Sequence, residues 1–81
     1  MKTYEKVGEI AAFESIPWGK HVIVTGSIGG SRAWFHRLPG VFLNDNNNIR
    51  FISDYGTVTC FSKGDPISIN LLGEAGEGEK E

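Results

Sequence analysis

Residues 49–71 read IRFISDYGTVTCFSKGDPISINL, and this run contains the plainest signs of β-structure in the chain. Near its end, Ile67, Ile69 and Leu71 alternate with polar residues. A period of two places these three side chains on one face of a sheet, where they can be buried. We therefore expect a strand over residues 66–71.

A β-hairpin is expected just before this strand. Residues 49–53 and 57–61 are rich in β-branched and aromatic side chains, which favour extended backbone. Only three residues, Asp-Tyr-Gly, separate the two runs, and so short a connection is typical of a hairpin. Val58 and Cys60 would share the buried face of the second strand, because an unpaired cysteine is among the residues most often found buried.

The remaining extended segments and loops follow from turn residues. We expect extended backbone over residues 20–25, 31–38 and 41–43, with a turn at Pro39 and Gly40 between the last two. We expect loops over residues 26–31, which are rich in glycine, and over residues 44–48, where Asn and Asp tolerate left-handed backbone.

The N-terminal segment, residues 4–14, allows two interpretations. Large apolar residues recur every three positions from Tyr4 to Phe13, which suits one face of a helix ending before Pro17. Against a helix, Gly8 lies inside the segment and no capping box is present. Alternation over the same residues also fits a strand, which we favour.

These elements predict a mostly β fold, a small antiparallel barrel or sandwich of five to six strands. Residues 19–26, GKHVIVTG, resemble the strand-and-glycine pattern common in SH3-like and OB-like barrels, and the resemblance covers these eight residues. We expect one domain over residues 1–72. Residues 73–81 alternate glycine with charge and contain no large apolar residue, so we expect a disordered acidic tail there.

Charge is unevenly distributed along the 81 residues. The formal net charge is −2, and residues 74–81 alone account for −3, which leaves about +1 for the rest. The tail is expected to act as a solubility appendage. Two alternatives stay open: the tail competes with a polyanion for the basic middle of the chain, or it docks onto a basic partner.

The chain lacks the residues that several classes of function require. A catalytic thiol requires a positioned base, and Cys60 lies in the middle of a strand. A structural zinc site needs more than the two histidines and one cysteine of this chain. The loop at residues 26–31 has neither the Gly-Lys-Ser/Thr sequence of a P-loop nor the G-x-G-x-x-G spacing of a dinucleotide-binding loop. Nothing in the sequence indicates a pair of carboxylates in which one has a raised pKa. We therefore expect no enzymatic activity, no cofactor and no metal.

The chain has one cysteine, no apolar leader in its first ten residues and no apolar run long enough to cross a membrane. These features predict a cytoplasmic protein without membrane association.

Residues 32–38, RAWFHRL, are the most suggestive of a binding surface. Strict alternation gives two faces. One carries Arg32, Trp34, His36 and Leu38, and the other carries Ala33, Phe35 and Arg37. Two neighbouring large aromatics on one strand cannot both face the core, so we expect one of them to face away. An aromatic side chain beside arginine is typical of interface hot spots, and it also suits stacking on single-stranded bases. Alternatively, one aromatic lies in the core and the other closes an open barrel end.

The leading hypothesis is a non-enzymatic protein-binding module that acts as an accessory, regulatory or inhibitory factor, of the kind that bacteriophages often encode. One alternative is a small nucleic-acid-binding barrel, and another is a structural subunit that forms a homo-oligomer through its strand edges. The candidate binding residues are Trp34, Phe35, Arg32, Arg37, Arg50, Lys20, Trp18 and His36. Nucleic-acid binding predicts the arginines on one face with an aromatic between them, whereas protein binding predicts an exposed apolar patch or a free edge strand.

Overall fold

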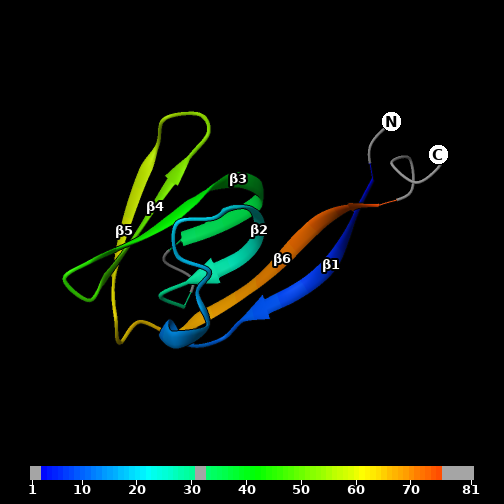
Figure 1. The fold of residues 1–81 in the computed structure, drawn as a ribbon. Coiled ribbons are helices and arrows are strands. Elements are labelled where there is room, and N and C mark those ends of the chain that lie inside the picture. Colours follow the sequence, from blue (N-terminus) through cyan, green and yellow to red (C-terminus); the bar gives the residue numbers. More distant parts are fainter. Residues whose placement is uncertain (1–2, 31–32, 76–81) are drawn as a thin grey trace.

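The computed structural model describes residues 3–30 and 33–75, which form one antiparallel sheet of six strands (Figure 1). The strands are β1 (Thr3–Ile10), β2 (His21–Ile28), β3 (Ala33–Asp45), β4 (Asn48–Ser53), β5 (Val58–Ser62) and β6 (Ile67–Ala75), and a short 3-10 helix, η1 (Phe13–Ser15), follows β1. Their order in the sheet is β1-β6-β2-β3-β4-β5. The expected mostly β, antiparallel fold is confirmed. The sheet is open, because no pairing joins β1 to β5 within the described ranges, so a closed barrel is not confirmed.

The N-terminal segment is a strand, and the helical alternative is wrong. β1 pairs with β6 from Thr3 opposite Ala75 to Ile10 opposite Ile69. The register shifts between Lys6 and Gly8, which marks a β-bulge. Of the apolar residues that recur every three positions, Ile10 is buried, whereas Val7 is exposed and Phe13 lies in η1, so the spacing does not reflect one buried helical face.

β6 continues beyond the expected domain boundary at residue 72. Gly73 lies opposite Glu5, and the pairing with β1 extends to Ala75. Backbone hydrogen bonds order these three residues without any large apolar side chain. The expectation of disorder is therefore wrong for residues 73–75, and residues 76–81 lie outside the described part of the chain.

β3 runs without a break through Pro39 and Gly40, so the expected turn is wrong. Pro39 lies opposite Ile23 of β2, and its carbonyl oxygen accepts a hydrogen bond from the Asp54 N–H (2.8 Å). The N–H that proline lacks would point to this same side, away from β2, so the pairing of β3 with β2 continues through Pro39.

β2 also extends into an expected loop, because it reaches Ile28 rather than ending before Gly26. Gly26 has a φ of 136°, and a Cβ atom there would lie 2.1 Å from the carbonyl oxygen of Ser68 in β6. Glycine is therefore required where β2 and β6 approach each other. Gly29 and Gly30 follow β2 and both have positive φ.

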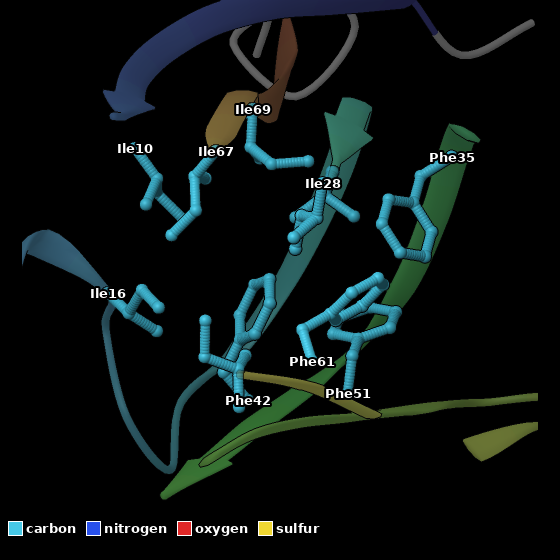
Figure 2. Close-up of a cluster of buried hydrophobic side chains, with 11 residues drawn as sticks. Ile10, Ile16, Ile28, Phe35, Phe42, Phe51, Phe61, Ile67 and Ile69 are labelled. Carbon is cyan, nitrogen blue, oxygen red and sulfur yellow. The ribbon is translucent and has the colours of Figure 1, made fainter. Parts of the chain in front are cut away.

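The core lies on one face of the sheet, and we call the opposite face the outer face. Phenylalanine rings lie close together in the core (Figure 2), where the centroids of Phe42 and Phe51 are 4.7 Å apart. Phe35 meets Phe51 edge-on at 5.4 Å. Burial of each such ring contributes roughly 1.5–3 kcal/mol. The buried apolar residues are Ile10, Ile16, Val24, Ile28, Phe35, Phe42, Ile49, Phe51, Phe61, Ile67 and Ile69.

Candidate functional site

A β-bulge in β3 determines which of its side chains reach the outer face. Phe35 lies opposite Gly26 and Leu38 lies opposite Val24, so His36 and Arg37 both face Thr25. Arg37 has a φ of 48°, as an extra residue in a bulge often does.

This extra residue exchanges the two faces of the strand, so Leu38 packs against the core and does not share the face of Trp34. The expectation that Trp34, His36 and Leu38 lie on one face is therefore wrong for Leu38. The bulge contains no glycine or proline that would have predicted it from the sequence.

The two neighbouring aromatics of β3 have opposite environments. Phe35 is buried against Phe51, whereas Trp34 is 71% exposed on the outer face, opposite Ser27 of β2. The structure thus shows that Trp34 is the aromatic that faces away from the core. Trp18 differs from both, because it is half-buried and its ring lies 5.0 Å from that of Phe13. It covers part of the core.

The basic candidates are divided between two parts of the sheet. Arg37 lies over the ring of Tyr4, 5.8 Å from its centroid, next to the exposed His36. Arg50, on β4, donates a hydrogen bond to the Asp45 carboxylate (Nη2–Oδ2, 2.6 Å), so its charge is largely offset. Lys20 is exposed in the turn before β2, and Arg32 lies outside the described residues. The described arginines do not form a single basic stripe.

A second surface, which the sequence reasoning missed, lies on the outer face of β3, β4 and β5. Val41, Ile52 and Val58 are opposite one another across the three strands. Val58 is 56% exposed and the nearby Leu43 is 39% exposed. The surface that we call the outer apolar row consists of Val41, Leu43, Ile52, Val58 and Cys60.

The expectation that Val58 and Cys60 are buried is wrong, because both are exposed. Phe61 is the buried residue of β5, and its ring lies 6.2 Å from that of Phe35. Since alternate residues share a face, burial of Phe61 directs Val58 and Cys60 outward. The large ring at the end of Thr-Val-Thr-Cys-Phe was the signal that could have revealed this arrangement.

β5 presents unpaired backbone groups at the edge of the sheet. The N–H of Ser53 donates to the carbonyl oxygen of Thr57 (2.9 Å), which sets the phase of the β4–β5 ladder. Alternation along that ladder directs the N–H and C=O groups of Thr59 and Phe61 toward β4. Those of Val58, Cys60 and Ser62 point away from it.

Of these outward residues, Ser62 already has a local partner. Its N–H donates to the Asp65 carboxylate (2.9 Å), and its carbonyl oxygen accepts from the Asp65 N–H (3.0 Å). Within the described ranges, no strand pairs with the outward side of β5, so Val58 and Cys60 form its open edge.

A hollow of about 270 Å³ lies beside this edge. It is lined by Asp45, Asn48, Ile49, Arg50, Cys60, Phe61 and Ser62. The Nε atom of Arg50 is buried there without a hydrogen-bond partner. His21 at the start of β2 contacts Asp54 (Nε2–Oδ2, 2.9 Å), which fixes the turn that leads into β5.

The described residues include neither a cluster of metal-ligating side chains nor a helix of membrane-spanning length. They contain no group of three or more His, Cys, Asp or Glu side chains placed to hold a metal ion. They also contain no helix with the length and hydropathy needed to cross a membrane.

Comparison with protein-family models, with curated protein sequences and with solved structures gave no match to this chain.

Proposed function

We propose that this chain is a non-enzymatic, cytoplasmic protein-binding module that takes up an extended segment of its partner at the edge of β5. One observation carries the proposal: β5 is an uncharged edge strand in which Val58 and Cys60 direct their backbone groups away from the sheet. Strand addition satisfies such groups with main-chain hydrogen bonds and leaves specificity to the alternating side chains.

The outer apolar row supports the same mode of binding. Val58 has Ile52 as its cross-strand neighbour on one side and no strand on the other among the described residues. A partner strand would place a side chain beside Val58, and an apolar or β-branched pair contributes roughly 0.2–1 kcal/mol. The preferred partner segment is therefore extended and carries an apolar residue at that position.

Strand addition at β5 would support a regulatory or inhibitory role. A segment held as an added strand has its backbone groups occupied, and it is withheld from other partners for as long as it stays bound. The exposed thiol of Cys60 fits a reducing compartment, where it stays unoxidised.

Selection from a library of displayed random peptides tests the proposal. Cys60→Pro removes one outward N–H and leaves the bonds to β4 intact, while the control Cys60→Ser changes the thiol and keeps the N–H. We expect selected peptides to bind the original chain and Cys60→Ser equally, and to bind Cys60→Pro at least tenfold more weakly. Equal binding to a folded Cys60→Pro variant would exclude strand addition at β5.

A second candidate function, nucleic-acid binding, rests on Trp34. This side chain is 71% exposed on the outer face, and the exposed His36 and Arg37 follow it in the chain. Stacking of a base on such an aromatic contributes about 1–3 kcal/mol. Fluorescence anisotropy of labelled single-stranded DNA, duplex DNA and RNA at low and physiological salt measures this binding. Binding that is lost in Trp34→Ala would favour this function over strand addition.

A further inference from the structure

We infer that the open edge of β5 is self-complementary, and that two copies of this chain pair through it as antiparallel strands about a two-fold axis at Thr59. The inference rests on the proposed function in one respect, since it also takes β5 as the binding edge. It adds the partner, which is a second copy, and the register of the pairing.

The register follows from which backbone groups are open. In an antiparallel ladder, two residues that exchange hydrogen bonds lie directly opposite each other. A residue whose N–H and C=O groups point away from β4 must therefore lie opposite a residue of the second copy whose backbone groups also point away from its own β4. Val58 opposite Cys60 of the second copy, with Cys60 opposite Val58, forms two such pairs. Together they exchange four hydrogen bonds, and every open N–H and C=O group of the two residues gains a partner.

The neighbouring registers leave groups unpaired. If Cys60 lies opposite Cys60, each Val58 meets Ser62, whose N–H and C=O groups are already bonded to Asp65. If Val58 lies opposite Val58, each Cys60 meets Gly56, whose N–H donates to the Ser53 carbonyl oxygen (3.1 Å). The register centred on Thr59 is the one that uses all the open groups.

Side chains and charges are compatible with this arrangement. Residues 58–62 carry no charge, so pairing of β5 with itself brings no like charges together. Lys63 lies in the turn that follows β5 and Asp54 lies in the turn that precedes it, so the antiparallel arrangement brings the Lys63 end of one copy to the Asp54 end of the other, and two-fold symmetry repeats this proximity. Opposite charges thus flank both ends of the paired strands.

The outer apolar row gains from the pairing as well. Val58 acquires Cys60 of the second copy as its missing cross-strand neighbour, and the two sheets become one continuous sheet. An isologous contact of this kind closes after two copies, because each β5 edge is then occupied. The pairing therefore predicts a dimer and not a fibre.

Sedimentation of the full chain over a range of concentrations, in the presence of a reductant, tests the association. We expect a concentration-dependent shift from monomer to dimer for the original chain and for Cys60→Ser. Cys60→Pro removes an N–H at the axis, and we expect it to stay monomeric at concentrations where Cys60→Ser is a dimer. A chain that remains monomeric throughout would overturn the inference.

Cross-linking tests the register. In the Cys60→Ser background, Thr59→Cys places two cysteines opposite each other at a Cα separation of about 4.5 Å, which a disulfide can span. Val58→Cys in the same background places the two cysteines diagonally. We expect mild oxidation to cross-link the first variant at least tenfold faster than the second. Equal rates would contradict the register.

The two proposals fail separately. Peptides that bind a monomeric chain at β5 would support the proposed function and overturn self-pairing. A β5-dependent dimer whose edge selects no peptide, even when diluted to monomer, would support self-pairing and exclude a foreign strand as the partner.

Discussion

The two edges of the sheet, β1 and β5, lie on opposite sides of the molecule and differ in how they are protected (Figure 1). β1 carries Glu5, Lys6 and Glu9 within eight residues, and a bulge interrupts its ladder at Val7. β5 has five residues, and it has neither a charge nor a bulge. Both strands expose one valine, Val7 at 63% and Val58 at 56%, so apolar exposure alone does not distinguish them.

Charges and bulges are the usual devices that keep an edge strand from pairing with another chain. β1 combines both, whereas β5 has neither along its length. The backbone and the charge pattern of an edge, rather than its exposed apolar area, therefore indicate where this fold can accept another strand.

Phe61→Ala should have the largest effect, because Phe61 is the buried residue that anchors β5 to the core. It is 5% exposed, and its ring packs against that of Phe35. Truncation of a buried phenylalanine typically costs about 3–5 kcal/mol. We expect urea unfolding, followed by tryptophan fluorescence, to show a loss of this size, with a smaller loss for Phe61→Leu. A loss below about 1 kcal/mol would contradict the packing of β5 described above.

Gly40→Ala should have the next largest effect. Gly40 lies where β3 begins to pair with β4, the strand to which β5 is bonded. A Cβ atom there would lie 2.4 Å from the carbonyl oxygen of Ile52 and 2.6 Å from the Phe51 ring. The ring can shift but the β4 backbone is held in its ladder, so we expect a loss of roughly 1–3 kcal/mol. The control Gly64→Ala meets no atom within 4 Å and should change the unfolding free energy little. An equal loss in both variants would show that crowding at Gly40 is not the cause.

The sequence predicted the strands better than their ends. Alternation of Ile67, Ile69 and Leu71 identified β6, because one regular face of that strand is buried. Its continuation through Gly73 depends on backbone pairing with β1, which leaves no hydrophobic signal. The continuity of β3 through Pro39 depends on where β4 ends, and that is a tertiary fact.

The candidate site was predicted only in part, and for the same physical reason. The adjacent positions of Trp34 and Phe35 in one strand predict that one of them faces away from the core, but a bulge at Arg37 decides which residues accompany Trp34. The residue pattern does not predict the open edge of β5, and it wrongly predicts buried side chains at Val58 and Cys60. An edge is defined by the order of strands in the sheet, and local residue patterns do not contain that order.

Removing charge from β1 should make its edge more like that of β5. Lys6→Thr combined with Glu9→Thr keeps the net charge and leaves a β-branched, uncharged pair in place of an ion pair. We expect more association in sedimentation at high concentration, with little change in unfolding free energy. The control, Glu14→Thr with Lys20→Thr, removes the same charges outside both edge strands and should stay unchanged. Association limited to the control would contradict the protective role of charge on β1.

Glu9→Gln should have the smallest effect, and it separates protection of the edge from stability of the fold. A hydrogen bond from Lys6, and secondarily the lysine charge, hold the pKa of Glu9 below its ordinary value of 4.5. The stabilisation is therefore present above pH 4.5 and is lost as the pH falls through the lowered pKa of the folded state. Both side chains are exposed, so salt screens the interaction. Urea midpoints at neutral and acidic pH should show a slight deficit for Glu9→Gln that disappears in acid and in high salt, and Lys6→Met should reproduce it. A deficit that persists in acid, where the carboxyl group is protonated, would contradict the assignment of this stabilisation to the ion pair.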